Sequence, residues 1–380
     1  MAQIHWCGTG LSSGPGLRRL IDAGRAVTIW TIERAQAEAI LAGRHAHVAD
    51  YSAEALDATL RPGDVVVSML PPDLHATVAR IALRRGAHFA CSSYLSPELR
   101  ALDPVARKAG VALVGEVGLD PGIDHLMAHD LIAEYRASGT VAPGNTLSFT
   151  SYCGGIPAQP NAFRYKFSWS PLGVLRALKS PSHSIRHFSE LRVQRPWRAV
   201  SRYDMPLPQP ETFEVYPNRD SLPFIAEYRL DPEWRIEDFV RGTIRLLGWA
   251  EAWQPVFDAL EDESEGAERR LAQLAEKLWR ENSYAPGEPD RVVLAVTLQA
   301  KRDGRAVFHR SWLLDATGDA RGSAMARLVS GTLSLAVEAI LAHDVPAGVH
   351  AAPHDPKLVK GWLAALETQA QYLAKVDHLR

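Results

Sequence analysis

Short β-branched segments alternate with helical segments over the first 116 residues of this chain. Six segments have the composition of strands: Ile4 to Cys7, Val27 to Trp30, His47 to Ala49, Asp64 to Met69, His88 to Ala90 and Val111 to Gly115. Stretches between them, such as Ala35 to Leu41 and His75 to Arg85, have the apolar spacing of amphipathic helices. Because continuous apolar runs such as Val65-Val66-Val67 indicate strands buried on both faces, we predict an α/β fold with a six-stranded, doubly wound parallel sheet.

The rhythm changes after Asp120-Pro121-Gly122, where a long mixed region of aromatic residues, prolines and polar turns begins. A chain of 380 residues has room for two domains. We therefore predict a doubly wound domain at 1–124, an α+β domain at 125–315, and a helical segment at 316–380 that returns to the first domain. Further expected elements are a charged helix, a late hairpin and a closely packed helix: Glu261 to Arg280, Arg291 to Ala300 paired with Ala306 to Leu314, and Gly322 to Leu341.

Charge and hydropathy exclude several classes of protein. The 42 Lys and Arg residues balance 44 Asp and Glu residues, so the net charge of −2 offers no basic excess for a nucleic-acid backbone. No stretch reaches the roughly 18 uninterrupted apolar residues of a membrane helix, and the first residues do not resemble a signal peptide. We therefore expect a cytoplasmic protein that binds neither nucleic acid nor a membrane. Cys7, Cys91 and Cys153 lack metal-site spacing and are expected to be thiols, with no metal site.

A glycine-rich loop follows the first predicted strand. Gly8-Thr9-Gly10-Leu11 leads through Ser12-Ser13 to Gly14-Pro15, where a helix is expected to begin. Glycines let the backbone approach a pyrophosphate at a helix N-terminus, so the loop predicts a dinucleotide-binding Rossmann domain at 1–124. The alternative is a plain strand-to-helix turn, because Ser13 stands where the third glycine of the pattern would be. The position of the loop at the first βα turn favours the cofactor.

The residues after the second strand bear on which dinucleotide is bound. An acidic residue there would bind a ribose 2′-hydroxyl and an arginine a 2′-phosphate, and Glu33-Arg34 offers both. The same two residues suit the solvated first turn of a helix equally well. The sequence therefore leaves NAD and NADP open.

Polar residues follow the fourth, fifth and sixth strands, whose carboxyl ends meet at one edge of a doubly wound sheet. These residues are Ser68-Met69-Leu70 with His75 beyond, Cys91-Ser92-Ser93-Tyr94, and the run from Gly118 to His125. Tyr94 and Asp120 are the better candidates for chemistry. Gly118 and Gly122 can be turn residues only, and Asp124 or His125 can merely cap the following helix.

Candidate ligand-binding residues in the second domain combine glycines, a thiol and arginines. Cys153-Gly154-Gly155 permits close approach to a ligand, although a buried structural cysteine is the commoner case. Arg219 and Arg241 stand beside turn-forming residues and suit bidentate recognition of carboxylates, with surface arginines as the ordinary alternative. In the functional interpretation, these arginines bind the carboxylates of a small molecule.

Several motifs, in order along the chain, resemble the saccharopine reductase family, the glutamate-forming saccharopine dehydrogenases of lysine metabolism. They are GTG from Gly8, SSYLSP from Ser92, GLDPGIDHLMA from Gly118, SYCGGIPA from Ser151, YKFSWSPLGVL from Tyr165, YPNRDSLP from Tyr216 and VRGTIR from Val240. The resemblance implies a Rossmann domain joined to a substrate domain. It also implies a reversible, NADP- or NAD-dependent oxidation of saccharopine to L-glutamate and 2-aminoadipate 6-semialdehyde.

By the same resemblance, two sets of residues would contact the ligands. The cofactor set is Gly8, Thr9, Gly10, Leu11, Ser68, Met69, Leu70, Ser92, Ser93, Val117, Gly118 and Leu119. The substrate set is Tyr94, Leu119, Asp120, Cys153, Gly154, Arg219, Arg241, Gly242 and Thr243. Two departures from the family pattern are the missing fungal-type arginine after the second strand and the poor match of 255–320. We expect the protein to form a homodimer.

The chemistry of saccharopine agrees with these residues. Saccharopine carries three carboxylates, for which arginines and glycine N–H groups are suitable donors. Hydride transfer needs mainly orientation, whereas making and breaking the imine needs a general acid or base at the nitrogen. Asp120 is the first candidate for that catalytic role, with Tyr94 and Cys153 as hydrogen-bonding or proton-relay partners.

Two rival functions stay open on the sequence. An imine reductase similar to carboxynorspermidine dehydrogenase would join a diamine to an aldehyde, and its site would need additional acidic residues. A non-catalytic dinucleotide-binding sensor would keep the glycine loop but would not need Tyr94, Asp120, Cys153 and Arg219 together.

Overall fold

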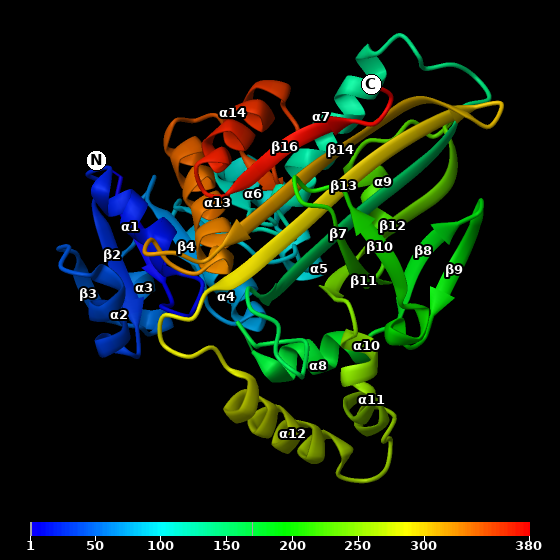
Figure 1. Ribbon diagram of the computed structural model, residues 1–380. Coiled ribbons are helices and arrows are strands. Elements are labelled where there is room, and N and C mark those ends of the chain that lie inside the picture. Colours follow the sequence, from blue (N-terminus) through cyan, green and yellow to red (C-terminus); the bar gives the residue numbers. More distant parts are fainter. Residues whose placement is uncertain (1, 169) are drawn as a thin grey trace. The chain divides into compact units, whose positions relative to one another are not determined.

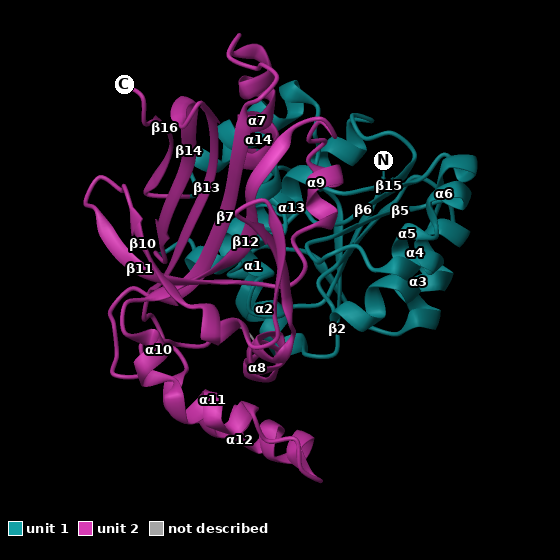
Figure 2. Cartoon of the chain, turned by 90° about the vertical axis from the view of Figure 1, so that its right-hand side faces the viewer, with its two compact units in different colours: residues 1–126, 320–369 teal, residues 127–319, 370–380 magenta. Residues whose placement is uncertain are grey.

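The computed structural model describes residues 2–168 and 170–380, which form two compact units. Unit 1 comprises residues 1–126 and 320–369, and unit 2 comprises residues 127–319 and 370–380 (Figure 2). The domain boundaries predicted from the sequence, after residues 124 and 315, remain a prediction. Met1 and Trp169, the latter in the motif from Tyr165, lie outside the described residues.

Unit 1 is built on a parallel sheet in the order β15-β6-β5-β4-β1-β2-β3, of which Figure 1 labels β2, β3 and β4. Its strands are β1 Ile4–Cys7, β2 Val27–Thr31, β3 His47–Asp50, β4 Val65–Ser68, β5 His88–Cys91, β6 Ala112–Val114 and β15 Gly348–His350. The side chains of β1 and β4 are buried, as expected for strands covered on both faces. The predicted fold class, an α/β Rossmann-type sheet with a second mixed domain, is confirmed.

The prediction of six strands is corrected to seven by β15. This three-residue strand lies far along the chain and pairs with β6 in parallel register, Gly348 beside Ala112. The Val349 N–H donates to Oδ1 of Asp103, at the start of α6, over 2.8 Å, which fixes the strand at the edge of the sheet. A strand of three residues has no periodicity of its own, so the sequence pattern could not indicate it.

The helices of unit 1 follow the predicted alternation. They are α1 Gly14–Asp22, α2 Arg34–Leu41, α3 Ala53–Thr59, α4 His75–Arg84, α5 Pro97–Arg100, α6 Asp103–Ala109, α13 Ala324–Leu341 and α14 Pro356–Glu367, with the short 3₁₀ turn η1 Pro72–Leu74. The closest helix contact joins α1 to α13, because the Gly16 N–H donates to the Ser330 hydroxyl over 2.8 Å. A Cβ atom on Gly16 would lie 1.9 Å from the Ser330 carbonyl oxygen, so only glycine fits there.

Within the described residues, α13 is the one helix long and apolar enough to cross a membrane, judged by length and composition. Of that stretch, 72% is buried inside the fold. Since the core helix of a globular protein has the same properties, α13 is weak evidence for a membrane span. Its close packing on α1 fits the helix of a core.

Unit 2 is built on a mixed sheet in the order β10-β11-β12-β7-β13-β14-β16, with β8 and β9 attached at β12. Its strands are β7 Thr146–Pro157, β8 Ser182–Arg186, β9 Ser189–Val193, β10 Ser201–Met205, β11 Glu211–Pro217, β12 Arg235–Leu246, β13 Asp290–Arg302, β14 Arg305–Thr317 and β16 Tyr372–Asp377. The long hairpin β13–β14 turns at Asp303-Gly304, as predicted. The end of the chain differs from the expected helical segment, because β16 pairs with β14.

Several helices of unit 2 contribute to an aromatic cluster. The helices of this unit are α7 Ile123–Ala137, which begins in unit 1, α8 Pro171–Lys179, α9 Pro223–Glu227, α10 Trp249–Ala252, α11 Gln254–Leu260 and α12 Ala267–Asn282, with the 3₁₀ turn η2 Pro196–Ala199. Trp249 and Trp253 are fully buried, with ring centroids 5.2 Å apart, at the centre of one hydrophobic cluster. The expected charged helix from Glu261 begins at Ala267 instead, since Gly266 just before it adopts a left-handed conformation.

Candidate functional site

The glycine loop joins β1 to α1 in unit 1. Gly8 has a φ of 98°, and a Cβ atom there would lie 2.8 Å from the carbonyl oxygen of Met69, just after β4. A Cβ atom on Gly10 would meet nothing within 4 Å, so this part of the loop is open. Helix α1 has no side-chain cap, because the Ser13 hydroxyl donates back to the Gly8 carbonyl. Its first turn also contains no acidic residue. The loop and the positive helix end therefore fit a pyrophosphate.

Polar groups continue across the carboxyl ends of β1 and β2. The hydroxyls of Thr9 and Thr31 lie 2.8 Å apart, and the Glu33 N–H donates to the Thr31 hydroxyl over 3.0 Å. Arg34, the first residue of α2, lies 3.5 Å from Asp50, and both side chains are strongly exposed. Such an ion pair contributes little, so breaking it to bind a ligand costs little.

His75 connects the ends of β4 and β5. Its Nδ1 lies 2.8 Å from the Ser68 hydroxyl and its Nε2 lies 3.0 Å from the Ser93 hydroxyl. Burial lowers the pKa of His75 to about 4, so the ring is neutral near pH 7. The Ser92 hydroxyl points to the Met69 sulfur at 3.8 Å. Three predicted cofactor-contacting serines thus lie at neighbouring strand ends, and His75 holds two of them.

A buried ionic network supports the loop that follows β6. The carboxylate of Glu116 accepts hydrogen bonds from the Leu95 N–H at 3.0 Å and from Arg100 at 3.1 Å, and it lies 3.0 Å from Nε2 of His125. Burial alone would raise the pKa of Glu116, but these donors lower it. Asp124 accepts from the Gly122 N–H at 2.7 Å. Asp124 and His125 therefore make structural contacts at this loop. The structural alternative considered from the sequence was a cap of the following helix.

The supported loop carries the predicted cofactor residues Val117, Gly118 and Leu119. It closes tightly, since the Gly118 N–H donates to the Pro121 carbonyl at 2.9 Å. The peptide bond before Pro121 is cis. A Cβ atom on Gly122 would lie 2.1 Å from the Gly118 carbonyl oxygen, so this position needs glycine. Val117 and Leu119 are buried, with 0% and 4% of the residue exposed.

Tyr94 and Asp120 come together in unit 1. The Tyr94 hydroxyl donates to Oδ1 of Asp120 over 3.1 Å, and both side chains are partly exposed. Tyr94 follows β5 and Asp120 follows β6, so the pair lies at the carboxyl ends of adjacent parallel strands. A carboxylate there can hold or release a proton, and the phenol can orient it.

Strands β7 and β12 of unit 2 bring Cys153 and Thr243 side by side, as register partners. The neighbouring glycines are required by packing. A Cβ atom on Gly154 would lie 2.4 Å from the Ile244 carbonyl oxygen, and one on Gly242 would lie 2.5 Å from the Tyr216 carbonyl oxygen. Close strand contact thus explains both glycines without a ligand.

Arg219 and Arg241 lie in one corner of unit 2. The Asn218 N–H donates to the Arg241 carbonyl at 2.9 Å, which places the turn containing Arg219 against β12. Arg219 adopts a φ of 56°, a conformation that non-glycine residues rarely take and that is often found at functional sites. The Arg241 guanidinium is buried and lies 3.9 Å from the centroid of the Phe224 ring.

Sequence reasoning missed three buried residues: Glu116, His75 in its bridging role, and Arg245. Arg245 donates to the Tyr216 hydroxyl over 3.0 Å, and its guanidinium lies 4.9 Å from the centroid of Tyr165. Strand alternation places Arg241, Thr243 and Arg245 on one face of β12, a signal already present in the motif from Val240.

Two family models match nearly all of the chain. Residues 4–114 match the saccharopine dehydrogenase NADP binding domain, and residues 118–371 match the saccharopine dehydrogenase C-terminal domain. Among curated relatives, the saccharopine dehydrogenase [NADP(+), L-glutamate-forming] of Pyricularia oryzae is 37% identical over 250 residues, or 64% of this chain and 54% of that protein. The enzyme of the same name from Saccharomyces cerevisiae is 39% identical over 248 residues, or 62% and 52%. The chain thus spans about half the length of the curated relatives it matches.

Solved structures give the same family likeness. The apo saccharopine dehydrogenase (L-Glu forming) from Saccharomyces cerevisiae superposes with a TM-score of 0.85 at 26% identity, covering 99% of this chain and 100% of that chain. A homospermidine synthase from Legionella pneumophila superposes with a TM-score of 0.64 at 10% identity, covering 99% and 91%. At that identity, the second match is a likeness of fold alone.

Proposed function

The chain belongs to the saccharopine dehydrogenase family, and on that premise we propose that it catalyses the reversible, NADP-dependent oxidation of saccharopine to L-glutamate and 2-aminoadipate 6-semialdehyde. The observation that carries the proposal is the hydrogen bond from Tyr94 to Asp120, at strand ends of a Rossmann-type sheet. It supplies a carboxylate for proton transfer on the unit that carries the glycine loop. The two fungal relatives are L-glutamate-forming saccharopine dehydrogenases, which supports saccharopine as the substrate and L-glutamate as one product.

In the proposed reaction, each protein group has a separate role. A nicotinamide cofactor, when bound at the glycine loop, would supply the acceptor for the hydride that leaves the carbon that becomes the aldehyde. The Asp120 carboxylate takes a proton from the substrate ammonium and passes it to solvent, which leaves the neutral amine that hydride loss converts to a protonated imine. The carboxylate then removes a proton from the water that adds to the imine carbon. Asp120 returns this proton to the nitrogen of the carbinolamine and takes the hydroxyl proton as the C–N bond breaks, which releases glutamate and leaves the aldehyde. Tyr94 orients Asp120, and Cys153 is proposed as a further proton-relay partner.

Arginines provide the proposed recognition of the acidic substrate. Arg219 and Arg241 are assigned to two substrate carboxylates, since guanidinium groups bind carboxylates by paired, charge-assisted hydrogen bonds. Thr243 and the backbone around Gly154 and Gly242 complete the proposed contacts in unit 2. Tyr94, Leu119 and Asp120 complete them in unit 1.

We further propose that NADP is preferred over NAD. The family model of the first domain and the relatives are both named for NADP. The exposed Arg34, only loosely paired with Asp50, is assigned to the 2′-phosphate. The glycine loop, the Ser68 to Leu70 strand end, Ser92, Ser93 and the backbone of 117–119 are assigned to the rest of the cofactor.

A direct assay tests the proposed function. Purified protein is mixed with NADP⁺ and saccharopine, and the reduced cofactor and released glutamate are both measured. The proposal predicts equal amounts of the two products. Turnover of a diamine-derived imine without saccharopine oxidation would move the function to the rival imine reductase, and cofactor binding without any turnover would favour a sensor.

The cellular location and the assembly are also proposed. We infer that the enzyme is cytoplasmic and forms a homodimer. We also infer that it acts on a small molecule and has no nucleic-acid or membrane partner. Light scattering on the eluting peak of a sizing column should give twice the mass of the chain, whereas a single chain mass would remove the homodimer.

A further inference from the structure

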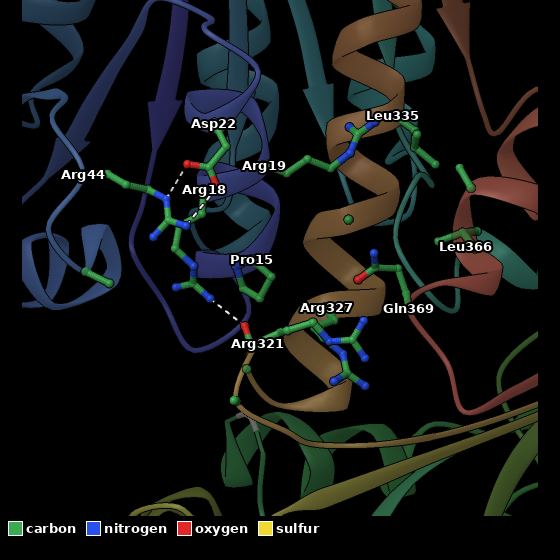
Figure 3. A pocket seen from close by; sticks show the side chains of 15 residues that line it. Pro15, Arg18, Arg19, Asp22, Arg44, Arg321, Arg327, Leu335, Leu366 and Gln369 are labelled. Atoms are coloured by element: carbon green, nitrogen blue, oxygen red, sulfur yellow. Dashed lines mark hydrogen bonds and ion pairs between the residues drawn. The ribbon is translucent and has the colours of Figure 1, made fainter.

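Unit 1 contains an arginine-lined cavity of about 640 Å³ that none of the proposed cofactor or substrate residues line (Figure 3). Four segments form it: α1, the residues after α2, the stretch from Ala320 into the middle of α13, and the end of α14 with the residues after it. Five of its lining residues are arginines: Arg18, Arg19, Arg44, Arg321 and Arg327. Asp22 is the acidic lining residue.

Two helix faces create this cavity. On α1, Pro15, Arg18, Arg19 and Asp22 lie on one face, at the spacing of successive turns. On α13, Gly331 lies one turn after Arg327, and a Cβ atom on Gly331 would meet nothing within 4 Å. The absent side chain at residue 331 therefore helps to keep the cavity open.

Two of these arginines, Arg18 and Arg19, are held in place by neutral groups. Arg18 donates to the carbonyl oxygens of Ile40 at 3.1 Å and of Arg321 at 2.7 Å. Arg19 donates to the Ser334 hydroxyl at 2.9 Å. Neither Arg18 nor Arg19 forms an ion pair within 2–168 and 170–380. Asp22 is engaged by Arg44 through two hydrogen bonds of 2.6 and 2.8 Å, as Figure 3 shows.

Arg18 and Arg19 therefore bring positive charge to the cavity that no ion pair within the described residues compensates. Burial lowers the pKa of Arg18, and the like charge of Arg44 lowers it further, against an opposing contribution of Asp22. An ordinary solvated arginine extends into water and is not fixed by carbonyl oxygens. Arginines gathered from separate segments around a concave space instead form the donor array that phosphate and carboxylate groups need.

We propose that this cavity binds a small polyanion with at least two phosphate or carboxylate groups. The cavity volume is in the range of small-molecule sites. Its apolar lining residues, Leu335 and Leu366, would contact the carbon skeleton of an organic ligand. The inference is independent of the proposed reaction, because it concerns a different surface of unit 1.

Calorimetric titration with two probes tests this inference, using inorganic pyrophosphate for the phosphate source and citrate for the carboxylate source. The full chain is first saturated with NADP⁺, so that pyrophosphate cannot bind at the glycine loop, and ionic strength is held constant with NaCl. At least one probe should bind with a stoichiometry of one per chain. The dissociation constant should rise about tenfold in Arg19→Gln, since one guanidinium is lost.

Two variants make the result specific. Gly331→Leu should fill the cavity and abolish probe binding while the protein stays folded, because leucine favours a helix more than glycine does. Arg61→Gln removes an equal charge from an exposed side chain of the same unit and should leave binding unchanged. Absence of binding by both probes, or equal binding by wild type and Gly331→Leu, would overturn the inference.

Discussion

The Tyr94 hydroxyl donates a hydrogen bond of 3.1 Å to the Asp120 carboxylate, joining residues that follow two adjacent parallel strands. Donation from a phenol stabilises the ionised form of a carboxylate and fixes its direction. The buried carboxylate of Glu116 and its hydrogen-bond donors support the loop that carries Asp120. Position and support together suit Asp120 for proton transfer.

Replacing Arg219 with Met should weaken substrate turnover. Methionine keeps some bulk but has no donors, so transition-state binding should fall by roughly 2 to 4 kcal/mol through loss of a carboxylate partner. The measurement is kcat/KM for saccharopine together with the dissociation constant of NADP⁺, which should stay the same. Arg192→Met, an exposed arginine of the same unit, is the matched control. If Arg219→Met kept the wild-type kcat/KM, Arg219 would be an ordinary surface arginine.

Replacing Arg34 with Gln should change cofactor preference. If Arg34 holds the 2′-phosphate, kcat/KM for NADP⁺ should fall by about tenfold or more and that for NAD⁺ should hardly change. Glu33→Gln should have the opposite effect on the ratio, because it removes a negative charge beside the phosphate. If Arg34→Gln left the ratio of kcat/KM for NADP⁺ to that for NAD⁺ unchanged, another group would have to recognise the 2′-phosphate.

His75 should make the fold sensitive to mild acid. Its pKa in the folded protein, about 4, lies below the ordinary value of 6.5, so the folded state binds fewer protons between these values. The resulting stability is complete above pH 6.5 and is lost as the pH falls towards 4. Between pH 7 and pH 5 the loss should be about 2 kcal/mol of unfolding free energy.

Denaturant unfolding of His75→Asn at the two pH values checks this prediction. The variant should show less pH dependence than wild type by that amount, whereas His45→Asn, at an exposed position, should behave as wild type. Equal pH dependence in His75→Asn and wild type would mean that the ring is already protonated or solvated in the folded protein.

Gly16→Ala should destabilise unit 1 through its contact with α13. The added methyl group would overlap the Ser330 carbonyl, and overpacking of this kind costs about 1 to 3 kcal/mol. Gly361→Ala, inside α14 where nothing lies within 4 Å, should instead stabilise by up to about 1 kcal/mol. Thermal unfolding of both variants measures the difference. A Gly16→Ala protein as stable as wild type would contradict the close helix contact.

The sequence predicted those parts of the fold whose signal is local. Buried strands such as Val65–Ser68 are rich in β-branched residues because both faces are covered, and the hairpin at Asp303-Gly304 has its own turn signal. β15 and β16 had no such signal, since partners far away in the chain decide their pairing. The contact between Gly16 and Ser330 could not be predicted either, because these two residues are far apart in the chain.

The candidate site was predictable to the extent that its residues lie in motifs. Tyr94 and Asp120 could be paired in advance, because the ends of neighbouring parallel strands meet. The roles of Asp124 and His125 could not be decided, since they depend on the buried Glu116. Nor could the sequence separate the packing role of Gly154 from ligand contact, because only the neighbouring strand reveals it.

The most direct test of the central claim is the turnover of Asp120→Asn with saccharopine and NADP⁺. Asparagine keeps the shape of the side chain but cannot hold or release the proton, so kcat should fall by about 10² to 10⁴, while the NADP⁺ dissociation constant stays unchanged. Asp73→Asn, at an exposed carboxylate of the same unit, should keep full activity. Full turnover of Asp120→Asn with an unaltered pH–rate profile would contradict the account, and loss of NADP⁺ binding would reduce Asp120 to a structural support.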